Sequence, residues 1–168
     1  TEVLKRVTQL AARVCGAHRC TIVLRQENGE ETWDPVMSRF ADGREDPEMW
    51  SRFKDRGHPL RLHKVPEAER AIQDRRPLFV PDAPSSTLPQ HLIDPFDIQS
   101  ALLVPLIGRE EVIGLMVLDH VEQGCTFTER QKGLATSLAA QAALAIEDAR
   151  LYEEAQRRAE ELSSLEAV

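Results

Sequence analysis

Cysteine and histidine are the residues of this chain that most often carry chemistry, and the spacing of its cysteines gives catalysis no support. Cys15 and Cys20 lie five positions apart and Cys125 is remote, which is neither a C-x-x-C pair nor a disulfide framework. Serines, histidines and aspartates are scattered, with no G-x-S-x-G turn for a nucleophile and no glycine-rich phosphate loop. The sequence therefore predicts three ordinary thiols in a reducing compartment and no enzymatic activity for this domain.

The histidines leave one cofactor open, because a single imidazole can serve as an axial ligand of haem. The five are His18, His58, His63, His91 and His120. His91 is the best candidate, since it lies on an apolar segment with Leu92 and Phe96. Haem binding through His91 stands beside the alternative that all five are loop or helix-surface histidines.

The composition of the 168-residue chain indicates one globular domain with an appendage. Hydrophobic residues make up 42% and charged residues 29%, and no apolar run approaches the roughly 20 residues that span a bilayer. The formal net charge of -7 argues against DNA or RNA, because nucleic acids are bound mainly through Lys and Arg. Since no signal peptide is visible, we expect a cytoplasmic domain that contacts neither nucleic acid nor membrane.

The first part of the chain is predicted to be a helix followed by a hairpin. Apolar residues at steps of three and four indicate an amphipathic helix over residues 3–14, which Gly16 ends. Two runs rich in Thr, Ile, Val and aromatic residues follow, and the Asn-Gly pair within residues 27–30 predicts a tight turn between them. Pro35 in the second run indicates an edge strand.

Short elements are predicted in the middle of the chain. We expect a short helix within residues 42–58 and a brief strand over residues 59–65. Pro66 is placed to open another short helix, which Pro77 closes.

The stretch "RRPLFVPDAPSS" contains a strand, PLFVPD, between two prolines. Asp82 at its end is placed to accept hydrogen bonds from the backbone amides of Ser85 or Ser86. We interpret Asp82 as a residue that fixes the loop rather than as a ligand contact. A short or irregular helix follows over residues 85–97, because Pro95 interrupts its apolar spacing.

Two nearly continuous apolar runs, residues 98–107 and 112–118, predict central strands of a hairpin that is covered on both faces. A long helix then begins at Thr128, where Thr128 and Gln131 form a Thr-x-x-Gln capping box. No glycine or proline breaks this helix from Leu134 onward.

The end of the long helix carries an imperfect heptad stripe, which favours a parallel homodimer stalk over a solvated tail. The stripe residues are Leu144, Leu151, Ala155, Leu162 and Leu165. Asp148 and Arg158 interrupt the same stripe, and we expect them to weaken one register and so keep the stalk switchable.

The order of these elements, with the stretches "AIQDRRPLFVPDA" and "IQSALLVPLIGREEVIGLMVLDHVEQGCTFTERQKGLATSLAAQAALAIEDARLYEEA", resembles the GAF family of small-molecule-binding and signalling domains. The resemblance implies an α+β fold. Its central antiparallel sheet would have the first and last helices on one face, and short helices and loops forming a ligand pocket on the other. We expect the GAF domain to occupy residues 1–150 and a coiled-coil signalling helix to begin at residues 151–168.

The resemblance implies a regulatory sensor module of a cytoplasmic signalling protein, a histidine kinase or a diguanylate cyclase. The alternatives left open are a ligand-free dimerisation module and a haem-binding gas or redox sensor. Three branches of the family fit poorly. Residues 58–100 lack the cysteines of the methionine sulfoxide reductases, Asp119 and His120 replace the Asn-Lys pair of the cyclic-nucleotide domains, and no cysteine adjoins His91 as in bilin-binding relatives.

What remains is a pocket for an unidentified small molecule, built of apolar and aromatic residues with a few polar groups. Its expected lining consists of Met37, Trp50, Phe53, Phe79, His91, Phe96 and Ser100. The aromatic cluster in residues 49–53 has a second interpretation, in which it only pins that segment onto the sheet.

Overall fold

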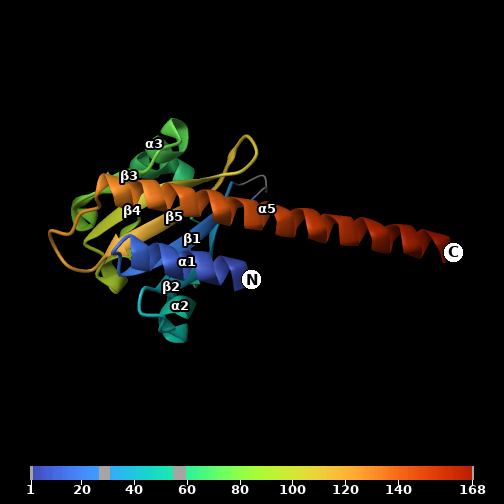
Figure 1. Cartoon of the computed structure of the whole chain (residues 1–168), viewed down its shortest axis with the longest axis horizontal. Helices are drawn as coiled ribbons and strands as arrows, with labels where there is room; N and C mark the ends of the chain where they lie inside the picture. Colours follow the sequence, from blue (N-terminus) through green and yellow to red (C-terminus); the bar gives the residue numbers. More distant parts are fainter. Residues whose placement is uncertain (1, 27–30, 55–59, 168) are drawn as a thin grey trace.

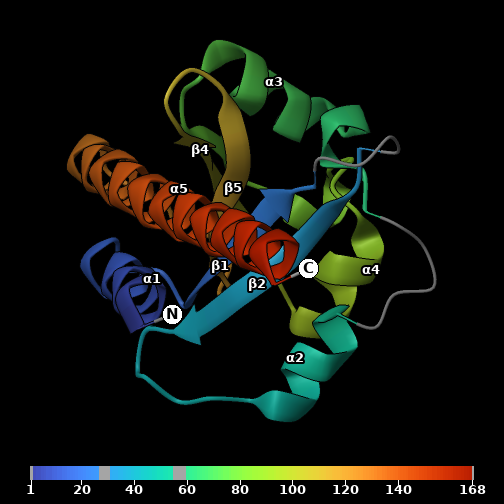
Figure 2. The same cartoon turned by 90° about the vertical axis from the view of Figure 1, so that its right-hand side faces the viewer.

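The computed structural model describes residues 2–26, 31–54 and 60–167. The chain forms a five-stranded antiparallel sheet in the order β2-β1-β5-β4-β3. Helices α1 and α5 cover one face, and the short helices cover the other (Figure 1, Figure 2). This arrangement confirms the α+β fold expected from the sequence.

The bounds of the elements follow the predicted runs closely. The strands are β1 (Arg19–Arg25), β2 (Trp33–Phe40), β3 (Leu78–Val80), β4 (Ser100–Ile107) and β5 (Val112–His120). The α-helices are α1 (Glu2–Val14), α2 (Pro47–Lys54), α3 (Pro66–Asp74), α4 (Gln90–Ile93) and α5 (Glu129–Glu166). Single 3-10 turns are η1 (Leu62–Lys64), η2 (Ala83–Ser85) and η3 (Asp94–Phe96).

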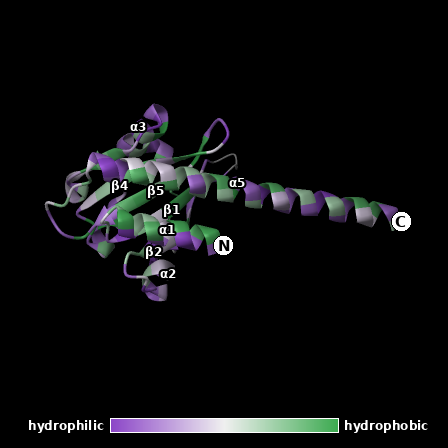
Figure 3. Cartoon of the chain, in the orientation of Figure 1, coloured by the Kyte–Doolittle hydropathy of each residue, from purple (hydrophilic) through white to green (hydrophobic). Residues whose placement is uncertain are grey.

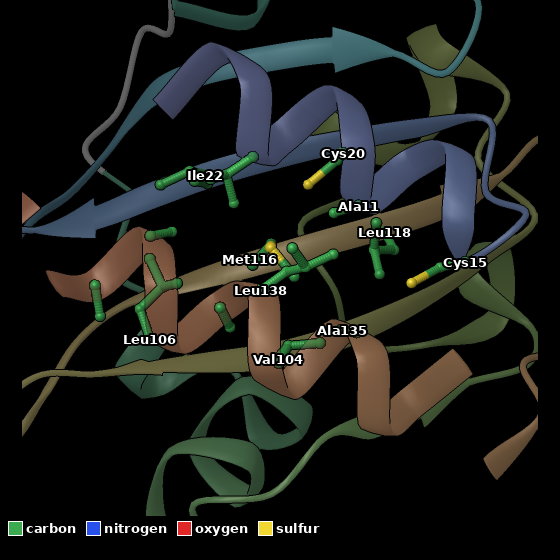
Figure 4. Close-up of a cluster of buried hydrophobic side chains, with 14 of the residues drawn as sticks. Ala11, Cys15, Cys20, Ile22, Val104, Leu106, Met116, Leu118, Ala135 and Leu138 are labelled. Carbon is green, nitrogen blue, oxygen red and sulfur yellow. The ribbon is translucent and has the colours of Figure 1, made fainter. Parts of the chain in front are cut away.

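Side chains of the central strands alternate between the two faces, as the two-residue period of a strand requires. One set packs beneath α1 and α5 and forms the helix-face core (Figure 4). Its labelled members are Cys20 and Ile22 of β1, Val104 and Leu106 of β4, Met116 and Leu118 of β5, Ala11 of α1, Cys15 directly after α1, and Ala135 and Leu138 of α5. The alternate set forms the pocket-face core with the short helices, and it includes Val23, Ala101, Leu103 and Leu115.

The first five turns of α5 pack closely on the domain because their buried residues are mostly alanines. Ala135, Leu138, Ala139, Ala142, Ala143 and Ile146 are its buried residues. The predicted capping box is present, with the Thr128 side chain accepting from the Gln131 amide at 3.1 Å. Beyond Ile146 no described residue of α5 is buried, and the helix projects away from the domain with mixed hydropathy (Figure 1, Figure 3).

The strand expected over residues 59–65 is wrong, because among its described residues only Leu60 bridges Trp33 and the chain then turns into η1. Leu60 and Leu62 are instead buried in the pocket-face core. Their apolar spacing therefore reflects burial in that core and not the hydrogen-bonded pairing of a strand. The tight turn expected within residues 27–30 lies outside the described residues.

Other local predictions hold. Pro35 lies on the edge strand β2. The Asp82 carboxylate accepts from the Ser85 amide at 3.3 Å, as expected for a loop-fixing residue. Helix α3 ends before Pro77, with Arg75 in the left-handed region at φ 53°. None of the described helices is both long and apolar enough to cross a membrane.

Gly114 of β5 gives a test of how tightly the sheet is built. A Cβ at this position would lie 2.5 Å from the Val23 carbonyl oxygen and 3.0 Å from side-chain carbons of Leu24 and Leu106. We expect Gly114→Ala to lower the free energy of unfolding by about 1–3 kcal/mol, measured by chemical denaturation. The matched control is Gly133→Ala on α5, where a Cβ meets nothing within 4 Å. This change should raise the free energy of unfolding by about 0.5–1 kcal/mol. Equal effects of the two changes would contradict this packing.

Candidate functional site

Two adjoining cavities lie between the sheet and the short helices. The inner cavity, of about 70 Å³, is almost wholly apolar, and its walls include Ala68 of α3, Leu92 of α4 and Leu115 of β5. The outer hollow, of about 300 Å³, is more polar and lies between β2 and α2. Arg19 and Phe53 line both, so these two side chains form the partition between them.

The floor of the inner cavity comes from alternate positions of β1 and β5. Arg19, Thr21 and Val23 of β1 line it, with Val117 and Asp119 among the β5 residues beside them. The strand register pairs Arg19 with Asp119 and Thr21 with Val117. Because directly opposed residues of an antiparallel pair face the same side, the sheet itself brings the two charged side chains together.

Arg19 and Asp119 form a buried ion pair at the edge of this apolar floor. Arg19 Nε donates to Asp119 Oδ2 at 3.0 Å, and the two side chains are only 5% and 1% exposed. Burial raises the pKa of the Asp119 carboxyl, while the charge and hydrogen bond of Arg19 oppose that rise. Asp119 Oδ1 is buried and has no hydrogen-bond partner among the described residues.

Aromatic side chains hold the guanidinium of Arg19 in place. The Arg19 Cζ atom lies 5.0 Å from the ring centroid of Phe96 and 5.8 Å from that of Phe53. Phe53 in turn stacks on Trp50 with 6.0 Å between centroids. Arg19 Nη1 donates to the Met49 sulfur at 3.4 Å. The cluster thus serves both interpretations made from the sequence, since it anchors α2 on the sheet and also borders the cavities.

The structure brings four of the seven expected site residues to this region. Met37, Trp50 and Phe53 line the outer hollow, and Phe96 lies beside Arg19 without lining either cavity. Met37 also packs against the helix-face core.

The other three expected residues lie elsewhere. Phe79 packs against the helix-face core, with its ring 5.7 Å from that of Phe127. Ser100 is buried but precedes Ala101 of the pocket-face core, so strand alternation turns it toward the helices. His91 is exposed on α4. All three residues were assigned to one pocket from their place along the chain. For Phe79 and Ser100 the face of the strand places the side chain elsewhere, and His91 lies on the exposed side of α4.

The described histidines do not fit an axial ligand for haem in these cavities, since none of them lines either one. His63 accepts a hydrogen bond from Trp33 Nε1 at 3.3 Å, and His18 packs edge-on against Phe40. His120 stacks near Phe127. His58 lies outside the described residues.

Cys15 and Cys20 have the character of structural thiols, whereas Cys125 is only partly buried. Cys15 and Cys20 are buried in the helix-face core, and burial raises the pKa of the Cys15 thiol to about 11 and that of Cys20 well above its usual value. Thiols protonated at neutral pH are poor nucleophiles. Among the described residues, no three Cys, His, Asp or Glu side chains are grouped to hold a metal ion.

Sequence reasoning missed Arg19 as a site residue and considered Asp119 only against the cyclic-nucleotide pattern. A usable signal was present, because each charge adjoins an apolar strand, in "RCTIVL" and "IGLMVLD". A charged residue that continues a buried strand needs a partner, and these two have opposite signs. Predicting that Arg19 pairs with Asp119 requires the register of β1 on β5, which cannot be derived from the sequence alone.

A family model described as GAF domain matches residues 1–146. A search of curated proteins finds no match.

Solved structures with this fold include three from different bacteria. A GAF domain/HD domain protein from Geobacter sulfurreducens has a TM-score of 0.72 and 20% identity, covering 89% of this chain and 93% of that one. A domain described as belonging to a two-component sensor histidine kinase protein of Sinorhizobium meliloti has a TM-score of 0.64 and 18% identity, with 94% and 95% covered. The blue-light-absorbing PixJ GAF domain of Thermosynechococcus elongatus has a TM-score of 0.67 and 14% identity, with 94% and 90% covered. At these identities the likeness concerns the fold.

The buried His120 predicts a pH dependence of stability. Burial lowers the pKa of His120. The charges of Asp119 and Glu122 and a hydrogen bond with the Thr126 backbone oppose this lowering, and His18 adds to it. The unfolded chain therefore binds a proton more readily than the folded one, so the free energy of unfolding should fall as pH drops below about 6.5. We expect His120→Gln to show a shallower decline between about pH 7 and pH 5 in denaturation experiments. A variant as steep as the parent would contradict this assignment.

Proposed function

The chain belongs to the GAF domain family, and we propose that it is the ligand-sensing regulatory module of a cytoplasmic signal-transduction protein. In this proposal a small molecule occupies the cavities between the sheet and the short helices. Its binding repacks those helices, and α5 carries the change to an output domain such as a histidine kinase or a diguanylate cyclase. The domain itself catalyses no reaction in this proposal.

The observation that carries the proposal is the polar pair at the wall of the inner cavity. A cavity that serves packing alone is expected to be apolar and closed, because each buried polar group without a partner costs free energy. Here one oxygen of Asp119 lacks a partner among the described residues, and this side chain borders a cavity of about 70 Å³. A few oriented polar groups in an apolar cavity are typical of a small-molecule site.

A chain of contacts around the edge of the sheet supports a route from the cavity to α5. Ala68 of α3 lines the inner cavity, and Arg75, which caps α3, donates through Nη2 to the Glu110 carbonyl at 2.6 Å. Glu110 belongs to the turn between β4 and β5. In the same turn the Arg109 amide donates to Glu147 of α5 at 3.0 Å. A shift of α3 would thus pull on the turn that holds α5 near its last buried residue.

Homodimerisation through α5 completes the proposed mechanism. Leu144, Leu151, Leu162 and Leu165 are exposed at 60%, 44%, 62% and 73%, at the heptad spacing noted from the sequence. A helix that projects from its domain gains most of its stability from a partner. We therefore propose a parallel pairing of the projecting helices of two copies, in which ligand binding shifts two packings relative to one another.

A second candidate, a ligand-free dimerisation module, is favoured by the size of the inner cavity. A volume of about 70 Å³ is far below the several hundred cubic ångströms typical of sites for drug-sized ligands. In that case side chains and water fill the cavity, and α5 alone carries the function.

Native mass spectrometry of the purified chain tests the function directly, because one spectrum reports both oligomeric state and retained small molecules. We expect a dimer with added mass that disappears under denaturing conditions. A dimer without added mass, unchanged by a metabolite extract, would favour the dimerisation module. A monomer at concentrations of tens of micromolar, whatever it retains, would overturn the proposed pairing through α5.

The heptad stripe gives a prediction for dimer affinity. Replacing both interruptions, Asp148→Leu with Arg158→Leu, should tighten the dimer by about tenfold or more, because buried leucines add apolar contact. Sedimentation equilibrium measures the change. The matched control, Glu153→Leu with Glu160→Leu, adds the same apolar surface away from the stripe and should leave the affinity nearly unchanged. An unchanged affinity in the stripe variant would exclude this stalk.

The proposed route is tested at Gly108, where a Cβ would overlap the Glu147 carboxylate. Enlarging the α3 wall by Ala68→Leu should alter hydrogen exchange of the α5 amides near Glu147. In a chain that also carries Gly108→Ala this response should be lost, whereas with Gly133→Ala it should persist. A response that survives Gly108→Ala would exclude the turn as the route.

A further inference from the structure

We propose that the inner cavity binds a small uncharged ring that contains an amide, with its N–H on Asp119 and its C=O on Arg19. The proposal rests on the sensing function above and names the class of ligand. It follows from the hydrogen-bonding capacity that the ion pair leaves unused, from the lining of the cavity and from its size.

The ion pair is open on one side. A guanidinium and a carboxylate can make two parallel hydrogen bonds. Here a single bond joins Arg19 Nε to Asp119 Oδ2 at 3.0 Å. Among the described residues, neither Asp119 Oδ1 nor Arg19 Nη2 makes a hydrogen bond. The ion pair therefore carries one unused acceptor and one unused donor, and both of its residues line the cavity.

Contacts on the far side of the guanidinium favour this open geometry. Arg19 Nη1 is directed to the Met49 sulfur at 3.4 Å, and the rings of Phe96 and Phe53 lie against the group. A thioether is a weak acceptor, so this bond satisfies little of the donor capacity of a buried guanidinium. Packing thus holds the Arg19 guanidinium where its Nη donors lack strong acceptors among the described residues.

The other described side chains that line the inner cavity offer a ligand no further polar contacts. Besides Arg19 and Asp119, Thr21 is the single polar residue among the described residues that line the inner cavity, and its hydroxyl is engaged with Ser38 Oγ at 3.0 Å. The recognised group must therefore offer one donor and one acceptor side by side. The amide of a small ring is held cis and presents N–H and C=O on the same edge, which meets this requirement.

Charge and size narrow the class further. The ion pair is neutral as a whole, so a charged ligand would enter an apolar cavity without a counterion, which is costly. A volume of about 70 Å³ has room for on the order of five water-sized groups, which corresponds to one small ring. A larger ligand would place its substituents in the outer hollow of about 300 Å³ beyond Arg19 and Phe53.

Ordered water is the competing occupant, since a water molecule can also bridge a donor and an acceptor. The two occupants differ in a measurable way. A water-filled cavity has no preference for the amide edge of a ring, whereas the proposed site loses its donor contact when the ring nitrogen is methylated.

The experiment compares three neutral rings of similar size, δ-valerolactam, N-methyl-δ-valerolactam and cyclohexane, by methyl NMR of the complete chain. The reporters are Val23, Leu103 and Leu115 at the cavity, and the internal controls are Val104 and Leu118 of the helix-face core. We expect δ-valerolactam to shift the reporters and to bind about tenfold or more tightly than its N-methyl analogue, the loss of a hydrogen bond to a charged group.

Asp119→Asn provides a second measurement that a purely structural role would not move. The asparagine oxygen would still accept from Arg19 Nε, and its NH₂ would point to the gap as a donor. The preference for δ-valerolactam over its N-methyl analogue should then fall to about one, while Asp148→Asn on the exposed face of α5 should keep it. If Asp119→Asn does not fold, the comparison of the three rings on the parent chain still tests the cyclic-amide class.

The outcomes separate this inference from the function it rests on. Equal binding of δ-valerolactam and its N-methyl analogue, or tighter binding of cyclohexane, would overturn the cyclic-amide class and leave a small-molecule site in place. A ligand retained in native mass spectrometry that lacks an amide N–H would do the same. If no ring shifts the cavity methyls, the cavity is not a site for small rings, and the sensing function loses its site as well.

Discussion

The alternation of side chains along β1 and β5 is the constraint on which the other features depend. Both strands are interior in the sheet, so each of their side chains must enter one of two cores. Ile22 and Met116 enter the core beneath the long helices, and Val23 and Leu115 enter the other. The same two-residue step places Arg19 opposite Asp119 at the end of the floor. A slip of β1 by one residue would exchange its two faces, so Arg19 would be buried beneath α1 and α5 and separated from Asp119.

Much of the fold could be predicted because its signals are local. The helix periodicity before Gly16, the apolar runs around residues 108–111 and the capping box at Thr128 each specify an element without reference to distant residues. The segment at residues 59–65 shows the limit of such reasoning. Leu60 and Leu62 have the spacing of a strand, but they enter the pocket-face core from a bridge and a 3-10 turn.

The site could be predicted only in part, because it depends on which face of each element turns inward. Trp50 and Phe53 border the cavities, as a helical aromatic cluster near the sheet should. Phe79 and Ser100 are on strands, where the direction of one side chain depends on a register fixed by residues far along the chain. Arg19 and Asp119 are 100 positions apart, so their pairing is a property of the assembled sheet. Burying such a pair contributes little stability on its own, which is consistent with a role in recognition.

The long α5 helix also gives the domain a mechanical advantage. From Ile146, the last buried residue, to Glu166 the helix extends about 30 Å at 1.5 Å per residue. If the last buried turn acts as a fulcrum, a tilt of only about 5° there would displace the far end by roughly 2.5 Å over that length. That displacement is larger than the helix shifts of about 1–2 Å that accompany switching at many subunit interfaces. A sub-ångström adjustment beside the sheet would thus reach the far end of α5 as a movement several times greater.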